Sequence, residues 1–303
     1  MDKAWITGAT GLLGRALMAE FRECYDGDFV GTGYSRAQGD VRKLDLRDAD
    51  TMERFFETQR PRYVLHSAAE RRPDLSEKDP EGTWSLNVES TRRLAKLCAQ
   101  HEAWLLYLST DYVFDGTSPP YQPGDPPTPL NHYGKSKLAW EDAVREVFDD
   151  YAILRVPILY GEVEELAESA VTVVALDLRK TPIPAQDHWA TRYPTHVADV
   201  ARVCRQMLEQ RAMEEGFRGV FQWSGNEPFT KYEMACAMAP ALGIDPTSIP
   251  SNPEPAEGAP RPKDCCLEAS LLESLAIGSQ RDFTESVQAI LRSAVQGAGT
   301  DSP

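Results

Sequence analysis

Tyr133 and Lys137 stand four positions apart in a segment with helical periodicity. Residues at positions i and i+4 share one face of a helix, so both side chains are expected to point at one site. A phenol with a pKa of about 10 is a poor acid or base at neutral pH, and a nearby ammonium lowers that pKa by favouring the phenolate. The pair is therefore a candidate proton donor with the lysine that tunes it.

A third candidate catalytic group is the hydroxyl of Thr110, in the run Ser109-Thr110-Asp111-Tyr112 that closes an apolar, strand-like stretch. Of the two hydroxyl residues, position favours Thr110. Such a hydroxyl can polarise a carbonyl while the phenol protonates it. The same residues can instead only hold a cofactor, because Lys137 is also placed to hydrogen-bond a nicotinamide ribose. The set by itself therefore does not decide between an enzyme and a binding protein.

A glycine-rich turn follows the strand-like run Ala4–Thr7 and opens the helical pattern Leu12–Cys24. The first glycine permits a tight turn, the second lets the backbone approach a pyrophosphate, and the third lets helix and strand pack closely. The helix N-terminus then offers N–H groups and its dipole to the phosphates. This strand–turn–helix context predicts a dinucleotide site. Its predicted cofactor-binding residues are Gly8, Thr10, Gly11, Leu12, Leu13 and Gly14.

The end of the second strand predicts NADP(H) rather than NAD(H). Many NAD-binding proteins place an acidic residue there to hold the ribose 2′-hydroxyl. This chain has Ser35-Arg36 instead, and a guanidinium can hold a 2′-phosphate through charge-assisted hydrogen bonds. The alternative is that Arg36 is a solvated loop residue.

Elements that would position these residues alternate along the first half of the chain, a rhythm typical of a doubly wound parallel sheet covered by helices. The strand-like runs are Ala4–Thr7, Phe29–Tyr34, Tyr63–Ser67, Trp104–Ser109 and Ile153–Leu159, and the helical runs include Leu12–Cys24, Ala49–Gln59, Thr83–Gln100 and Lys135–Val147. We predict an α/β Rossmann domain over residues 1–165, rejoined by about residues 190–222. A smaller lobe for substrate or partner is predicted over 166–303, with a disordered tail at about 297–303.

Composition narrows the partners and the compartment. The 303 residues carry a formal net charge of −15, which argues against nucleic acid and membrane surfaces as partners. Six cysteines show no paired or His-rich spacing, so neither disulfides nor a metal site is expected. No signal peptide or membrane-length apolar run is found. The cytoplasm is the expected location, with the nucleus as a second compartment.

Thr7 and the G-x-x-G-x-x-G spacing resemble the extended short-chain dehydrogenase/reductase superfamily. The resemblance implies that Asp45 and Leu46 lie at the adenine, and that Ala68 and Ala69 form a small-residue turn beside the cofactor. It also implies that Pro157 backs the nicotinamide and that Tyr133 and Lys137 contact the cofactor.

A narrower resemblance rests on segments outside the glycine turn. The stretches 109–116 and 129–135, and Arg261-Pro262, resemble the dTDP-4-dehydrorhamnose reductase branch of the superfamily. Within that branch the chain is similar to the regulatory (beta) subunits of methionine adenosyltransferase. That similarity is carried by residues 68–74, 157–164, 168–173, 194–197, 203–206, 223–227 and 230–237.

This resemblance implies a non-catalytic subunit that binds NADP(H), docks on the catalytic subunit of methionine adenosyltransferase and modulates S-adenosylmethionine synthesis. The alternative is an NADPH-dependent reductase of a nucleotide-linked keto-sugar. Two features depart from the regulatory family: residues 293–303 are not aromatic and basic, and Thr110 replaces the serine of those subunits.

Three further groups have two interpretations each. The cluster from Glu70 to Asp74 can meet an anionic substrate or a partner, or form an internally paired loop. The segment 187–192, which ends at Arg192, can line a pocket between lobes or pack a loop. The glutamates at 162, 164, 165 and 168 lack metal-ligand partners, and we interpret them as solvated surface.

Overall fold

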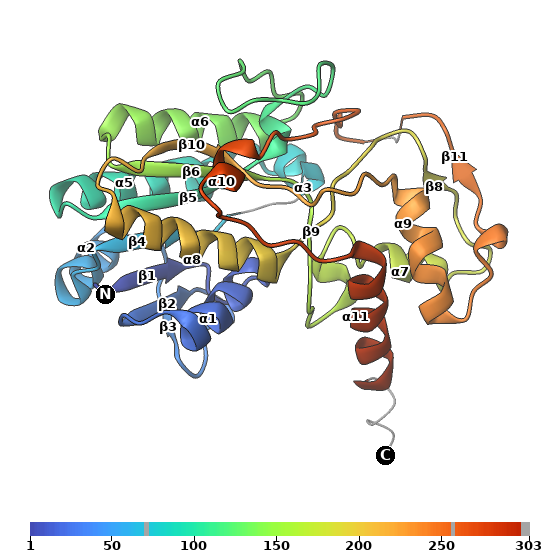
Figure 1. Ribbon diagram of the computed structural model, residues 1–303, viewed down its shortest axis with the longest axis horizontal. Helices are drawn as coiled ribbons and strands as arrows, with labels where there is room; N and C mark the ends of the chain where they lie inside the picture. Colours follow the sequence, from blue (N-terminus) through green and yellow to red (C-terminus); the bar gives the residue numbers. More distant parts are fainter. Residues whose placement is uncertain (70–72, 256–257, 298–303) are drawn as a thin grey trace.

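The computed structural model describes residues 1–69, 73–255 and 258–297, and its centre is a seven-stranded parallel sheet (Figure 1). The strand order is β10-β6-β5-β4-β1-β2-β3, with a topological reversal between β1 and β4. The strands are β1 (Ala4–Thr7), β2 (Phe29–Gly33), β3 (Val41–Lys43), β4 (Tyr63–His66), β5 (Trp104–Thr110), β6 (Tyr151–Val156) and β10 (Gly219–Gln222). The predicted doubly wound α/β fold is confirmed.

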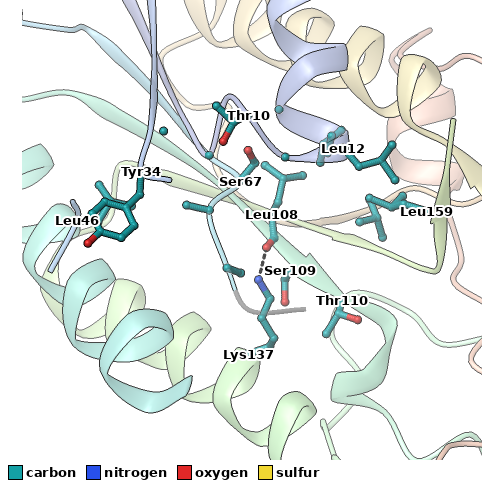
Figure 2. A pocket seen from close by; sticks show the side chains of 18 of the residues that line it. Thr10, Leu12, Tyr34, Leu46, Ser67, Leu108, Ser109, Thr110, Lys137 and Leu159 are labelled. Carbon is teal, nitrogen blue, oxygen red and sulfur yellow. Dashed lines mark hydrogen bonds between the residues drawn. The ribbon is translucent and has the colours of Figure 1, made fainter. Parts of the chain in front are cut away.

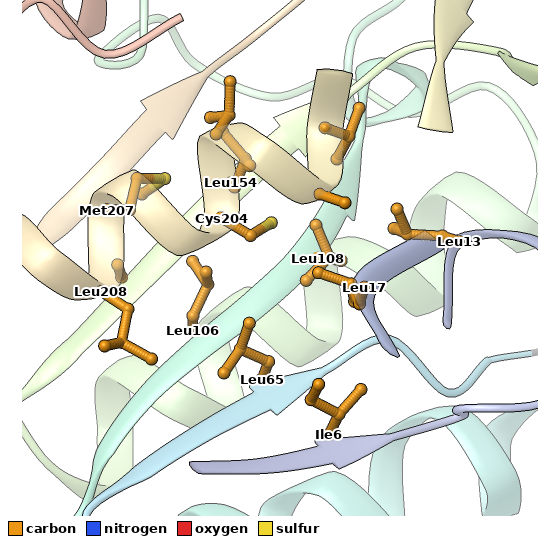
Figure 3. Packing of buried hydrophobic residues seen from close by; sticks show 14 of the residues in the cluster. Ile6, Leu13, Leu17, Leu65, Leu106, Leu108, Leu154, Cys204, Met207 and Leu208 are labelled. Carbon is orange, nitrogen blue, oxygen red and sulfur yellow. The ribbon is translucent and has the colours of Figure 1, made fainter. Parts of the chain in front are cut away.

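Helices cover both faces of this sheet because its central strands are apolar on both sides. Every residue of β1, β4 and β5 is buried. One face is covered by α1 (Leu12–Cys24) and α8 (Val197–Met213), and the other by α2 (Ala49–Gln59), α5 (Ser90–Gln100) and α6 (His132–Val147). Leu17 of α1 and Met207 of α8 meet Leu65, Leu106 and Leu154 of the strands (Figure 3).

A second hydrophobic cluster lies beyond the carboxyl edge of the sheet, at the right of Figure 1. It is built from α7 (Val174–Leu178), α9 (Lys231–Met238) and α11 (Phe283–Gly297), beside the short pair β8 (Gln186–Asp187) and β11 (Ser251–Asn252). The remaining short elements are β7 (Leu159–Tyr160), β9 (Thr195–His196), α3 (Pro73–Lys78), α4 (Pro80–Trp84) and α10 (Ser270–Ser274), with single turns of other helix types at 111–113, 166–168, 239–242 and 246–248.

The small cluster and the sheet interleave along the chain. The structure places α8 and β10, from the range 190–222, at the sheet rather than with α7 and α9. The domain boundaries at 1–165 and 166–303 stay a prediction. Gly297, predicted to begin a disordered tail, is the last residue of α11, and residues 298–303 lie outside the described part of the chain. Across the described ranges, no helix is long and apolar enough to cross a membrane.

Two helix boundaries differ from the prediction for physical reasons. The helix predicted over 83–100 contains a π-helical turn at Ser85–Glu89 between α4 and α5, which hydrophobic periodicity does not reveal. Helix α6 begins at His132, three residues earlier than predicted, because the Asn131 side chain caps it by accepting from the Gly134 N–H at 2.8 Å.

A buried ion pair ties α6 to the sheet. Glu141 of α6 is 0% exposed and accepts from Nε and Nη2 of Arg155 on β6, at 3.0 and 2.7 Å. Ser109 of β5 donates to the same carboxylate at 2.6 Å. The Arg155 hydrogen bonds hold the pKa of Glu141 below its usual value although burial works to raise it. Two neighbouring strands and a helix are thus joined directly beneath the predicted catalytic residues.

Removing one charge from this pair should destabilise the fold strongly. Glu141→Gln leaves Arg155 buried without its counter-charge, a loss of about 3–5 kcal/mol in the free energy of unfolding. Urea unfolding measures it. The control is Asp142→Asn on the same helix, where an exposed carboxylate is paired with Arg145 and about 0.5 kcal/mol or less is expected. Equal effects of the two substitutions would contradict the role of the buried pair.

Candidate functional site

A cavity of about 500 Å³ lies along the carboxyl edge of the sheet, where the strand order reverses between β1 and β4. Figure 2 shows Tyr34 and Leu46 at one end and Lys137 with Thr110 toward the other. Every residue that the sequence predicted for the site lines this cavity: Gly8, Thr10, Gly11, Leu12, Leu13, Gly14, Ser35, Arg36, Asp45, Leu46, Ala68, Ala69, Thr110, Tyr133, Lys137 and Pro157. The roles assigned to them stay predictions.

The glycine turn forms a cradle with no room for side chains. A Cβ on Gly14 would lie 2.0 Å from the Gly8 carbonyl oxygen, and a Cβ on Gly8 would lie 2.7 Å from the Ala68 nitrogen. Gly8 also has a φ of +68°, which glycine adopts without strain. Helix α1 begins here with no side-chain cap and no acidic residue in its first turn, so its positive end faces the cavity. These features fit a diphosphate held against the backbone.

Cationic side chains gather at the Tyr34 end of the cavity. The Arg47 guanidinium lies 5.1 Å from the centre of the Tyr34 ring, and the Lys43 ammonium lies 5.9 Å from it. The carboxylate of Asp45 already has a partner in the protein, since it accepts hydrogen bonds from Nε and Nη2 of Arg47 at 2.9 and 2.8 Å. These hydrogen bonds lower the pKa of Asp45, so it is an anion at neutral pH.

Arg36 lies in the loop after β2, where its side chain is 48% exposed and pairs with two carboxylates. Its Nη1 lies 2.5 Å from Glu164 and 3.2 Å from Glu168. Glu168 also receives two hydrogen bonds from Arg15, and its side chain is only 9% exposed. The interpretation of 162, 164, 165 and 168 as solvated surface is therefore wrong for Glu168, because sequence alone did not reveal that two arginines converge on it.

Lys137 is buried beside the cavity floor. Its Nζ donates to the Leu108 carbonyl oxygen at 2.6 Å and lies 4.3 Å and 4.6 Å from the ring centres of Tyr107 and Trp140 (Figure 2). Burial lowers the pKa of this ammonium to about 7, although Glu141 works in the opposite direction. Lys137 is consequently a mixture of charged and neutral forms at neutral pH, and only the charged form can lower the pKa of a neighbouring phenol.

The two hydroxyls at the end of β5 have different partners. Ser109 donates to the buried Glu141, whereas Thr110 donates to Asp111 at 3.0 Å and accepts from the Tyr112 N–H at 3.2 Å. Ser109 is thus engaged in the ion pair below the site. Both residues line the cavity, and the choice of Thr110 as the catalytic hydroxyl stays a prediction.

Tyr133 and Tyr112 bring two phenols to the same end of the cavity, with ring centres 6.1 Å apart. Asp111 lies next to them and is 5% exposed. Burial raises the pKa of its carboxyl to about 7, an effect that the positive charge of Arg192 partly offsets. Besides Lys137, this end of the cavity thus holds Asp111, Tyr112 and Tyr133 as groups able to donate or accept a proton.

Several residues that line the cavity were not predicted from the sequence. Most of them stand in segments that carry no recognisable motif. They include Tyr34, Arg47, Ser67, Pro73, Asp111, Tyr112, Ile158, Leu159 and Ala170. Position after a strand was the available signal for Asp111 and Tyr112, which stand in the run already noted. Ala170 and Leu159 come from a segment that only the fold brings to the cavity.

The other groups that the sequence analysis singled out lie in different parts of the structure. Residues 70–72 of the charge cluster lie outside the described residues, whereas Asp74 pairs with Arg261 at 2.8 Å. Asp187, Trp189 and Arg192 line a second cavity of about 190 Å³. In the described ranges, no group of three His, Cys, Asp or Glu side chains is placed to hold a metal ion, and all six cysteines are unpaired thiols.

Comparison with known proteins relates the chain to reductases and to beta subunits of methionine adenosyltransferase 2. The family model described as the RmlD substrate binding domain matches residues 2–296. The chain is 47% identical over 285 residues to methionine adenosyltransferase 2 subunit beta of Mus musculus, which covers 93% of this chain and 85% of that protein.

Solved structures with the same fold include dTDP-4-dehydrorhamnose reductases. A dTDP-4-dehydrorhamnose reductase of Clostridium acetobutylicum has a TM-score of 0.79 and 26% identity, covering 97% of this chain and 99% of its own. That of Bacillus anthracis, solved in complex with NADP, has a TM-score of 0.76 and 24% identity, covering 95% and 97%.

Burial of Asp111 predicts a pH-dependent stability. Its pKa rises from an ordinary 3.8 to about 7, so between these values the folded state binds more protons than the unfolded state. The stabilising contribution of the protonated form is present below pH 3.8 and lost as pH rises through 7. The wild type should therefore lose stability relative to Asp111→Asn over this range, by up to about 1.4 kcal/mol for each pH unit between the two pKa values.

Urea unfolding of both proteins between pH 4 and pH 8 measures this difference. Asp26→Asn is the control, since it makes the same substitution at an exposed position. A difference between wild type and Asp111→Asn that does not change with pH would contradict the raised pKa.

Proposed function

The chain belongs to the family of methionine adenosyltransferase 2 beta subunits, within the larger group that the RmlD substrate binding domain describes, and we propose that it is a regulatory subunit of this kind. It binds NADP(H), associates with the catalytic subunit and modulates S-adenosylmethionine synthesis without catalysing it. The observation that carries the proposal is identity of 47% across 93% of the chain. The cavity lining is a small part of that length, so shared dinucleotide binding does not account for the similarity.

The cofactor would be held along the cavity from end to end. Gly8, Gly11 and Gly14 with the start of α1 bind the diphosphate, and the residues at the Tyr34 end bind the adenosine. Those residues are Ser35 and Arg36 at the 2′-phosphate, with Asp45 and Leu46 at the adenine. At the other end, the cavity residues Ala68, Ala69, Tyr133, Lys137 and Pro157 hold the nicotinamide nucleoside. When bound, the cofactor supplies redox chemistry, which the regulatory role does not use.

The partner is proposed to be the catalytic subunit alone. The net charge of −15 opposes binding to nucleic acid or to anionic membranes. The cytoplasm, with the nucleus as a second compartment, is where such a subunit would meet its partner.

A single experiment tests the regulatory role. The chain is mixed with the catalytic subunit, with and without NADP⁺, and the mixture is analysed by size-exclusion chromatography and by an S-adenosylmethionine synthesis assay. We expect a stable complex with altered kinetics of synthesis, and little oxidation of NADPH by the chain itself.

A second function competes for the same site, because Thr110, Tyr133 and Lys137 all line the cavity. In a keto-sugar reductase, bound NADPH would supply the hydride for the carbonyl carbon. Tyr133 would give its proton to the carbonyl oxygen and take a proton back from solvent, so that the products are an alcohol and NADP⁺. Absence of a complex at micromolar concentrations would contradict the regulatory proposal. Oxidation of NADPH by a dTDP-4-keto-sugar that stops in Tyr133→Phe would establish the reductase.

Arg36 should decide between the two dinucleotides. Arg36→Gln removes a charge-assisted contact to the 2′-phosphate worth about 1.5–3 kcal/mol, so affinity for NADP⁺ should fall about tenfold or more while affinity for NAD⁺ stays unchanged. Isothermal titration calorimetry measures both. Arg22→Gln is the control, since Arg22 is similarly exposed, pairs with Asp40 and does not line the cavity. Equal losses for NADP⁺ and NAD⁺ would argue against this role of Arg36.

A further inference from the structure

Four charged side chains form an ion-pair network beside the cavity, at the end where Arg36 lines it. We call this group, Arg15, Arg36, Glu164 and Glu168, the clasp. Arg15 belongs to α1 and Arg36 to the loop after β2, whereas both glutamates come from the segment that follows β7, more than 120 residues later in the sequence. The clasp therefore joins the glycine-turn side of the site to the segment that leads into the smaller lobe.

One half of the clasp is a fixed anchor. Arg15 donates from both terminal nitrogens to Glu168, at 2.8 and 2.6 Å, and Nη1 also donates to the Thr10 carbonyl oxygen at 3.0 Å. Glu168 further accepts from the Glu164 backbone N–H at 3.1 Å and is 9% exposed. A bidentate pair with these extra bonds, largely removed from water, holds one geometry.

The other half is built to exchange partners. Arg36 and Glu164 are 48% and 50% exposed, and a single oxygen of Glu164 contacts Nη1 of Arg36. Arg36 also contacts Glu168 within the clasp, at the longer distances of 3.2 and 3.3 Å. Ion pairs between exposed side chains contribute little to stability, so a competing anion can displace this one.

A 2′-phosphate that bound the terminal nitrogens of Arg36 would compete for them with both carboxylates. It would also place a phosphate dianion against Glu164, a like-charge contact. We infer that Glu164 is a specificity-determining residue that competes with the 2′-phosphate for Arg36. Binding of NADP(H) transfers Arg36 from Glu164 to the phosphate and opens this half of the clasp, whereas NAD(H), which lacks the phosphate, leaves it closed. This inference rests on the proposed binding of NADP(H) in the cavity.

Glu164 belongs to the segment that leads from β7 into the hydrophobic cluster of α7, α9 and α11. Four residues after Glu164 the chain is anchored by Glu168, and Ser169, Val171 and Thr172 that follow are 0% exposed. Val171 packs in the hydrophobic cluster with α7, α9 and α11. The clasp thus connects the side chain that would hold the phosphate to the segment that leads into this cluster.

The test is calorimetric titration of the full chain with NADP⁺ and with NAD⁺. Glu164→Gln should bind NADP⁺ about two- to fivefold more tightly than wild type and bind NAD⁺ with unchanged affinity. Glu165→Gln is the matched control, since it removes the same charge at the neighbouring residue. The Glu165 side chain is exposed and makes no ion pair in the described ranges. Its affinities should equal those of wild type.

A double-mutant cycle separates exchange at Arg36 from simple repulsion. If Glu164 acts by occupying Arg36, then Glu164→Gln should have no effect on NADP⁺ affinity once Arg36→Gln is present. If it merely repels the phosphate, the gain in affinity persists in the double variant, which would overturn the exchange. A weaker affinity in Glu164→Gln would also overturn it, because Glu164 would then position Arg36 for the phosphate.

Titration of the wild type distinguishes failure of the clasp exchange from failure of the proposed NADP(H) binding. Wild type that binds NADP⁺ while Glu164→Gln and Glu165→Gln behave alike would refute the clasp exchange and leave the proposed function intact. Wild type that binds neither dinucleotide would refute NADP(H) binding itself, and with it the exchange.

Discussion

The close approach of α1 to the ends of β1 and β4 is the contact on which the site depends. A Cβ at Gly14 would collide with Gly8, and one at Gly8 would collide with Ala68. Because these positions carry no side chain, the N-terminus of α1 reaches the carboxyl edge of the sheet, where the order of strands reverses. Widening this contact would move the helix dipole and the cavity floor together, so the position of the dinucleotide follows from it.

The catalytic-type residues are held by a different set of forces. Glu141 and Arg155 form a buried ion pair that joins α6 to β5 and β6, and Lys137 lies one helical turn away from Glu141 with its ammonium on a backbone carbonyl. Burial favours neutral Lys137 and protonated Asp111, so both have a pKa of about 7. A site that only holds a cofactor tolerates this, while a reductase would depend on pH through both groups.

Much of the fold and site was predictable because it is encoded locally. Turn glycines, the spacing of Tyr133 and Lys137, and strand ends each specify a feature within a few residues, and all of these positions line one cavity. The π-helical turn at 85–89 and the partners of Glu168 were not predictable, since one breaks helical periodicity and the other depends on residues from three distant segments. The position of Ala170 in the lining has the same origin.

By itself, the sequence determined the α/β class, the dinucleotide-type turn and the family resemblance, because each is written in short-range pattern or in residue identity. Tertiary structure alone decided the state of the charged groups. Nothing near Arg36 in the sequence indicates an ion-pair partner, but the fold brings Glu164 to it from 128 positions away. Ion pairs and pKa values depend on distance and burial in three dimensions, and neither follows from separation along the chain.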